Sequence, residues 1–252
     1  MGHAKLAKRV KGIVPMARAF VSLLLWIPML ALADGRVPKP VGLTMSWTVS
    51  LDATGAITSL LPAEQTNQGL YERLEPGVRK WHFTPGKVNG EPAPSETTLT
   101  VHIQLEPVDS NYRVRVRDAG TGARYATMTP PKYPDGATVS RRGGAVMLEV
   151  HYDDAGKVTA AKPVEGGLPK PGSDIERAAV VAVKKWTFTP EKIGGHGLAG
   201  AVRVPLCFSA QPDGANHCHW QIGDEQVELD TKSPLAMNSI VHLETEVAEQ
   251  EL

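Results

Sequence analysis

The strongest constraint on the fold of this chain is a phrase that it contains twice. Residues 79–85 read RKWHFTP and residues 184–190 read KKWTFTP, and each tryptophan is followed nine positions later by a glycine, Gly90 or Gly195. Two aromatic residues two positions apart face the same side of an extended chain, and each buried ring removes about 150–250 Å² from water. Because such a pair is a large part of the core of a small domain, the phrase predicts one structural unit built twice.

We interpret the phrase as structural, with a ligand platform made by the aromatic rings as the alternative. A proline cannot donate a backbone hydrogen bond to a sheet, so the proline that closes each phrase is expected to end the strand. An alternating segment with an Asp-x-x-Gly turn precedes each phrase, WTVSLDATGAITSL or LEVHYDDAGKVTAA, and predicts a hairpin whose glycine takes a positive φ. The predicted core and turn residues are Gly55, Trp81, Phe83 and Pro85 in the first copy and Gly156, Trp186, Phe188, Pro190 and Gly195 in the second.

A helix is expected between the hairpin and the phrase of each copy. In the second copy Ser173 and Glu176 have the spacing of a capping box, and an apolar stripe at helical spacing runs from Ile175 to Trp186. In the first copy Pro76 lies inside the corresponding stripe, so that helix is predicted to be shortened, kinked or restarted. After the phrase each copy enters an alternating strand, TTLTVHIQL or GAVRVPLCF. The first copy is therefore predicted to be the weaker one.

The motifs of the second copy, taken together, resemble a known family. From about Tyr133 to Phe208 the chain combines a Tyr-Pro pair, the turn glycine, an Ala-rich helix, Trp-x-Phe-x-Pro and a Val-x-Val-Pro strand. This combination resembles the C-terminal domain of the TonB energy transducers of Gram-negative bacteria, and residues 41–105 are similar at lower strength, without the Tyr-Pro pair. The resemblance implies an α+β fold of two tandem domains, each a helix packed on a small antiparallel sheet.

The resemblance also implies a way of binding. Domains of this family bind an extended peptide of an outer-membrane receptor by adding it to their sheet as a strand. A Gln-Pro-x-Tyr-Pro stretch before the family domain contributes to receptor contact, and here Pro130 stands where the family has glutamine. The partner-binding residues implied by the match are Pro131, Lys132, Tyr133 and Pro134, with Arg203 and Val204 of the last strand.

The N-terminus predicts export. Five basic residues accompany an uncharged apolar run, residues 19–33, which ends in Ala-Leu-Ala. The run is shorter than the roughly 20 residues of a membrane span, so we expect residues 1–33 to be a cleaved signal peptide that leaves the protein periplasmic. The alternative is an uncleaved signal anchor in the inner membrane. Without the signal, 22 basic residues face 27 acidic ones, a balance that disfavours nucleic acid as a partner.

Two departures from the family concern force transmission. Family transducers have an anchor with a histidine that meets a motor complex, and a long Pro-rich rod across the periplasm. The apolar run here contains no histidine, and only Pro38 and Pro40 lie between it and the first copy. At about 3.1 Å per residue such a short linker does not cross a periplasm, so we expect no coupling to a proton-motive motor by the usual route.

Both cysteines, Cys207 and Cys218, lie late in the chain around the turn sequence QPDGAN. In an exported protein this spacing predicts a disulfide that closes a hairpin. Two free thiols, or a metal site that includes His217 and His219, are the alternatives. A strand would place these histidines on the face opposite to Cys218, which divides the ligand set.

The remaining segments are expected to connect and extend the two copies. Residues 107–129 predict a connecting hairpin on which Arg113, Arg115 and Arg117 share a face, either to discourage edge-to-edge pairing or to hold an acidic partner. The predicted domains are the signal peptide at 1–33, a degenerate copy at 38–106, the hairpin at 107–129, the intact copy at 130–210, and a C-terminal extension at 211–252 that ends in an acidic tail.

The resulting prediction of function is a non-enzymatic periplasmic protein that binds an envelope partner, such as an outer-membrane receptor, by strand addition. No catalytic triad, carboxylate pair or metal-ligand cluster has a usable spacing, so we expect no enzyme activity, cofactor, metal or small-molecule substrate. The alternative is an envelope scaffold that associates with itself through its sheet edges, as in a homodimer.

Overall fold

The structure is a computed structural model that describes residues 39–64, 67–109, 111–168, 170–209, 218–222, 224–228 and 231–251. The predicted signal peptide and His217 lie outside the described residues. Among the residues that are described, no helix has the length and apolar character needed to cross a bilayer. The chain from Pro38 onward groups into one unit, which contains two hydrophobic cores.

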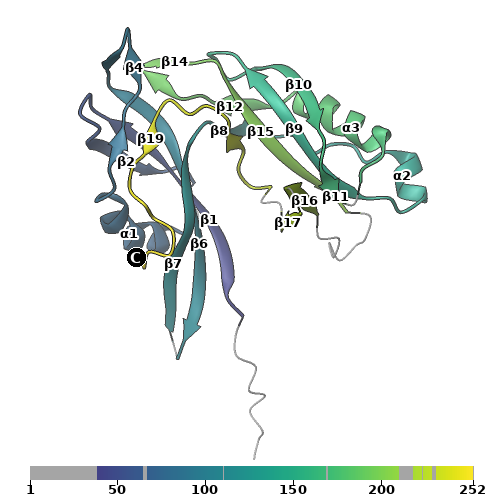
Figure 1. Cartoon of the computed structure of the whole chain (residues 1–252), viewed down its shortest axis with the longest axis horizontal. Helices are drawn as coiled ribbons and strands as arrows, with labels where there is room; N and C mark the ends of the chain where they lie inside the picture. Colours follow the sequence, from purple (N-terminus) through teal and green to yellow (C-terminus); the bar gives the residue numbers. More distant parts are fainter. Residues whose placement is uncertain are drawn as a thin grey trace, which may run out of the picture. The chain divides into compact units, whose positions relative to one another are not determined.

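The first core lies between a helix and an antiparallel sheet (Figure 1). Strand β1 (Val41–Leu51) pairs with β2 (Ile57–Pro62) on one side and with β6 (Ser95–Val108) on the other. Every second residue of β1 from Met45 to Leu51 is buried, as the two-residue period of a strand requires. The helix α1 (Gln68–Val78) and the first aromatic phrase add Tyr71, Leu74, Val78, Trp81 and Phe83 to this core.

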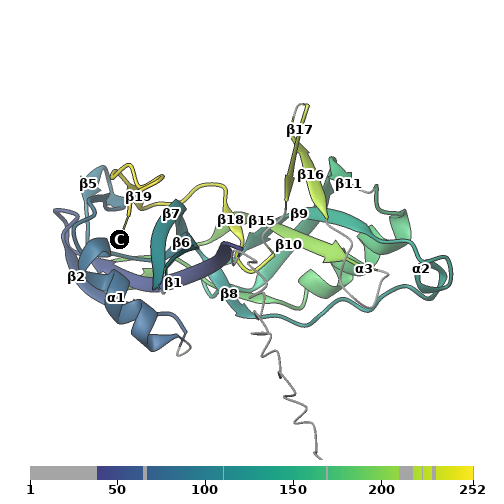
Figure 2. The same cartoon turned by 90° about the horizontal axis from the view of Figure 1, so that it is seen from below.

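The second core has the same kind of architecture (Figure 2). Strands β10 (Val158–Val164), β9 (Gly144–Tyr152), β15 (Gly200–Phe208) and β18 (Leu235–Ala236) form an antiparallel sheet in that order. The helix α3 (Ser173–Val183) packs against β9 and β10. The fold is therefore α+β, with a helix on an antiparallel sheet in each half.

Short elements complete the two halves. Strand β8 (Arg124–Thr127) pairs with β12 (Thr187–Thr189), and β13 (Lys192–Ile193) pairs both with β14 (His196–Gly197) and with the start of β6. Strand β4 (Lys87–Val88) pairs with β5 (Glu91–Pro92), and β11 (Gly167–Leu168), β16 (His219–Ile222) and β17 (Glu225–Glu228) form a separate small sheet. A one-turn helix, α2 (Asp135–Val139), precedes β9.

The two predicted hairpin turns pack onto the two aromatic phrases. Gly55 and Gly156 have φ values of 86° and 81°, and a Cβ at either position would overlap a backbone carbonyl oxygen, that of Phe83 or of Phe188. The backbone N–H of Phe188 also donates to the carbonyl of Gly156 at 2.8 Å. Each phrase therefore has two structural roles. Its backbone contacts a glycine turn, and its aromatic rings fill the core.

Two predictions about the helices are wrong. The N-cap of α3 is Gly172 in an extended conformation, and no side chain caps the helix, so Ser173 is the first helical residue and not part of a capping box. The helix α1 has 11 residues, as α3 has, although it contains Pro76. Pro76 removes the hydrogen bond to the carbonyl of Glu72, and α1 ends two residues after it, at Val78.

The predicted connecting hairpin is also different. Residues 111–122 form one strand, β7 (Asn111–Gly122), which pairs with β6 along residues 98–108. The hairpin is thus β6–β7, with its turn at Asp109, whose φ is 51°. Strand β6 continues past the predicted boundary at residue 106. The register of the β6–β7 pair shifts between His102 and Ile103, as at a β-bulge.

The C-terminal extension returns along the first half of the unit. Strand β19 (His242–Leu243) pairs with β3 (Phe83–Thr84), and Val241 and Val247 are buried in the first core. The acidic tail lies along β7, where Arg117 and Arg115 contact Glu249 at 2.9 and 3.2 Å and Arg113 contacts Glu251 at 3.3 Å. The three arginines therefore bind an acidic segment of their own chain.

Cys207 and Cys218 form a disulfide, with their Cα atoms 5.7 Å apart. The prediction of a disulfide is confirmed, and the alternatives in which the thiols are free or bind a metal are excluded. The bond connects the end of β15 to the start of β16.

Candidate functional site

The outer edge of β15 is the first component of the candidate site. On one side β15 pairs with β9 along its whole length, and on the other side β18 pairs only with Val202 and Arg203. Within the described ranges, no strand pairs with residues 204–206 on that outer side. This three-residue stretch of edge is about 10 Å long and adjoins β18, where an added strand could continue the sheet.

The corresponding strand of the first half has no such edge. Counting from the tryptophan of each phrase, Leu99 of β6 matches Val204 of β15. Strand β7 pairs with β6 from Thr98 to Val108 and so covers the matching edge. The two halves therefore differ most at the position where the family resemblance places partner binding.

The Pro-x-Tyr-Pro segment is the second component, and the second phrase and β15 hold it in place. The indole N–H of Trp186 donates to the carbonyl of Thr129 at 2.8 Å. The Tyr133 ring meets the Phe208 ring edge-to-face, with centroids 5.7 Å apart, and its hydroxyl donates to the carbonyl of Arg142. Burial raises the pKa of the Tyr133 hydroxyl, so this donor stays protonated at neutral pH. The segment is fixed beside the end of β15.

Of the residues implied by the resemblance, Tyr133 and the unpaired part of β15 are thus brought together. Arg203 has an exposed side chain and a backbone that pairs with Leu235 of β18, so its own edge is occupied. Val204 is the first residue beyond β18, and its side chain is buried in the second core. Its backbone pairs with Leu148 of β9, so the nearest outward group of the edge is the carbonyl of Pro205.

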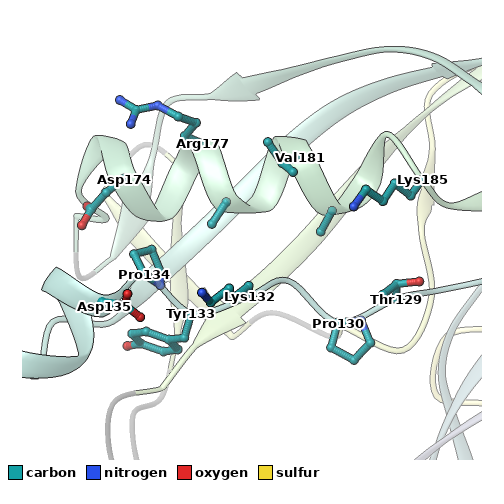
Figure 3. Close-up of a pocket in the computed structure, with 12 residues that line it drawn as sticks. Thr129, Pro130, Lys132, Tyr133, Pro134, Asp135, Asp174, Arg177, Val181 and Lys185 are labelled. Carbon is teal, nitrogen blue, oxygen red and sulfur yellow. The ribbon is translucent and has the colours of Figure 1, made fainter.

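A groove of about 550 Å³ between α3 and residues 129–135 is the third component (Figure 3). Sequence reasoning missed this groove, because it assigned Ala178 and Ala182 to the apolar stripe and gave no role to the other lining residues of the helix. The available signal was Arg177, Val181 and Lys185, which repeat every four residues along the outer face of the helix. The residues that line both walls include Lys132, Tyr133, Pro134, Arg177, Val181 and Lys185.

An ion pair closes one end of the groove. Two guanidinium nitrogens of Arg142 donate to the two carboxylate oxygens of Asp174 at 3.0 and 2.8 Å. These hydrogen bonds lower the pKa of Asp174 to about 2 and raise that of Arg142. The pair joins the loop before β9 to the first turn of α3, where a carboxylate also complements the helix dipole.

A buried carboxylate connects the second phrase to the rest of the chain. Glu191 is 5% exposed and accepts hydrogen bonds from the Thr97 hydroxyl at 2.6 Å, the Ser239 hydroxyl at 2.8 Å and the backbone N–H of Ile240 at 3.0 Å. Burial raises the pKa of nearby Tyr152 to about 12, and the charge of Glu191 adds to this shift. Glu191 thereby joins β6 and the C-terminal extension. Glu191 was not predicted from the sequence. The available signal was a difference between the copies, since Gly86 stands at the matching position of the first copy.

Comparison with known proteins locates the family likeness in the second half. The family model of the Gram-negative bacterial TonB protein C-terminal matches residues 129–210. Protein TonB of two strains of Xanthomonas campestris pv. campestris is 38% identical over 82 residues, which are 32% of this chain and 35% of the relative. Protein tonB2 of Pseudomonas aeruginosa is 37% identical over 90 residues, which are 34% of this chain and 31% of the relative.

The chain thus spans about a third of the length of these curated relatives. The matched residues begin beside the Pro-x-Tyr-Pro segment and end just after β15, so they include all three components of the candidate site. The family likeness of this chain is therefore to the Gram-negative bacterial TonB protein C-terminal, and it covers residues 129–210.

Proposed function

We propose that this chain is a non-enzymatic periplasmic protein that binds an extended segment of an envelope protein by adding it as a strand to the outer edge of β15. The observation that carries the proposal is the edge of β15 at residues 204–206, which no described strand covers, in the half that matches the family. The partner class is an outer-membrane receptor of TonB-dependent transport, because the curated relatives are TonB proteins. Removal of residues 1–33 places the chain in the periplasm.

In this proposal residues 38–106 are a degenerate tandem copy that no longer binds. Both halves have the same order of hairpin, helix, aromatic phrase and strand, and both set a turn glycine on a phenylalanine carbonyl. Strand β7 occupies the edge of the first copy over 11 residue pairs, whereas β18 occupies two residues of the second. Of the two matching strands, β15 is therefore the one with part of its outer edge uncovered by a described strand.

The proposal gives a role to Tyr133, Arg203 and Pro205. An incoming strand follows directly after β18, along residues 204–206, where the carbonyl of Pro205 faces outward. Pro205 contributes a carbonyl and no N–H, which limits the number of hydrogen bonds that the edge can form. Tyr133, held on Phe208, flanks the end of the added strand, and Arg203 offers an exposed cation at its start. In the alternative function, an envelope scaffold, a second copy of this chain would pair with the same edge in place of a receptor segment.

Site-specific photo-crosslinking in cells tests this proposal. A photoreactive amino acid at Arg203 is expected to crosslink to the periplasmic segment of an outer-membrane receptor, identified by mass spectrometry. The same group at Thr58, an exposed position on β2, is the matched control and is expected to give no such product. A crosslink from Arg203 to a second copy of this chain would support the scaffold instead. Equal products from both positions would refute binding at β15.

The predicted export is tested separately. Sequencing of the N-terminus of the protein from the periplasmic fraction is expected to begin at Asp34. A chain that retains Met1 and fractionates with the inner membrane would establish the signal anchor.

A further inference from the structure

The groove beside α3 is preformed. One wall is the outer face of α3, and the other is the segment 129–135, which is fixed by the Trp186 hydrogen bond to Thr129 and by the packing of Tyr133 on Phe208. Figure 3 shows Arg177, Val181 and Lys185 in order along the helix, with residues 129–135 running beside it. A ligand therefore meets two walls that are already in place.

The helical wall carries a cation, an apolar group and a second cation at regular intervals. Arg177 and Val181 are four residues apart on α3, and Lys185 extends this row by four residues into the turn after the helix, which ends at Val183. Val181 is 54% exposed, which leaves an apolar contact uncovered between the two cations. At 1.5 Å per residue in the helix and about 2 Å in the turn, the eight residues from Arg177 to Lys185 span about 13 Å along the helix axis.

The charges around the groove are predominantly positive. Lys132 adds a third cation from the opposite wall. Among the described residues, Lys132, Arg177 and Lys185 take part in no ion pair. Of the two lining carboxylates, Asp174 is already bound to Arg142, and only Asp135 remains. This basic surface belongs to a chain that is acidic beyond its predicted signal, with 22 basic residues against 27 acidic ones.

We propose that the groove binds an extended acidic protein segment with the pattern acidic–x–apolar–x–acidic. In an extended chain residues i, i+2 and i+4 face the same side, and four residues span about 13 Å. This distance matches the row on α3 to within about 1 Å, so two carboxylates meet Arg177 and Lys185 while the apolar residue contacts Val181. Polyphosphate or sulfated chains offer no apolar group for the central position. This site goes beyond the proposed strand addition, because it lies on the helix and does not use the β15 edge.

An NMR titration of the chain from Asp34 onward tests the inference, since the unit from Pro38 is compact on its own. The probe is the peptide Gly-Ser-Glu-Ser-Val-Ser-Glu-Ser-Gly at low salt, added to ¹⁵N-labelled protein. We expect saturable amide shifts along α3 and residues 129–135. Two control peptides, one with lysine for glutamate and one with both glutamates adjacent, are expected to bind less. Single changes Arg177→Gln and Lys185→Gln are expected to weaken binding about two- to fivefold each.

A charge swap separates lost binding from lost folding. The double variant Arg177→Glu/Lys185→Glu is expected to stop binding the glutamate peptide and to bind the lysine peptide instead. An unfolded variant would bind neither peptide in this way. Equal binding of all three peptides would overturn the pattern. Shifts in α3 that appear with heparin or anionic vesicles and not with the glutamate peptide would overturn a protein ligand. The β15 amides report strand addition in the same spectra, so failure of one site leaves the other assessable.

Discussion

Glu191 is predicted to be the residue whose loss most weakens the connection between the two halves. Its carboxylate accepts from Thr97, Ser239 and the backbone of Ile240, and it is nearly completely buried. In Glu191→Ala, Ser239 keeps the carbonyl of Val241 as an acceptor at 2.8 Å, whereas the Thr97 hydroxyl and the Ile240 N–H lose theirs. A buried donor left without a partner costs about 1–3 kcal/mol.

Two such donors, partly offset because the carboxylate no longer has to be desolvated, correspond to a loss of about 3 kcal/mol. In a folded unit of this size each kcal/mol lowers Tm by about 2–4 °C. Urea unfolding followed by circular dichroism measures the free energy directly. Glu165→Ala removes an exposed carboxylate and is the matched control, expected to change stability by no more than about 0.5 kcal/mol. A loss below about 1 kcal/mol for Glu191→Ala would refute the assigned role.

Three further predictions concern stability. Gly156→Ala is expected to lower the free energy of unfolding by about 3 kcal/mol or more in denaturant, because a Cβ there overlaps the Phe188 carbonyl. Gly195 has a similar φ and open space around it, so Gly195→Ala should lower this free energy by about 1 kcal/mol. Equal losses in the two variants would exclude the close approach at Gly156. The folded pKa of Asp174, about 2, lies below its ordinary value of 3.8, so its ion pair stabilises the fold above about pH 4 and loses that effect as the pH falls toward 2. Asp174→Asn should therefore be less stable than the parent at pH 5 and equal to it near pH 2, and a gap that persists at pH 2 would contradict the pairing. The disulfide between residues 207 and 218 closes a short loop, so Cys207→Ser/Cys218→Ser should lower stability by about 3 kcal/mol in thermal or urea unfolding, and an unchanged midpoint would contradict this.

Elements whose cause is local were predictable from the sequence. The hairpins around Gly55 and Gly156 depend on residues within about a dozen positions, and their alternation and turn glycines identify them. The apolar stripe of α3 ends at Trp186 because helix and phrase share one core. The family resemblance, read from the same local motifs, coincides with the matched residues 129–210.

Features that depend on distant residues were not predictable. Glu191 is buried through Thr97 and Ser239, which are 94 and 48 positions away, and nothing near Glu191 in the sequence indicates them. The path of residues 231–251 back to β3 and β7 is of the same kind, since its short strands have weak periodicity. Ser173 and Glu176 satisfied the spacing of a capping box, but Gly172 occupies the N-cap and Arg142 engages Asp174, so tertiary contacts override the local pattern.

The candidate site also combines features that local motifs predict with features that depend on distant residues. The Tyr-Pro pair and the last strand were recognisable, whereas the difference between the β6 and β15 edges arises from β7, which was expected to form a hairpin of its own. The groove arises because Trp186 holds the Thr129 carbonyl, a contact across 57 positions. Local motifs thus indicate the candidate site, and long-range contacts decide which part of a strand edge stays uncovered by described strands.

Hydrogen exchange at single-amide resolution along β15 tests the central claim most directly. In the free chain, the amides of Val204 and Leu206, which lie in a strand whose outer side no described strand covers, are predicted to exchange faster than those of residues 98–108 in β6, which pairs with β1 and β7. Addition of the receptor segment identified by crosslinking should protect the β15 amides and leave β6 unchanged. Protection of the β15 edge in the free chain, or no change on adding the segment, would contradict strand addition at this edge.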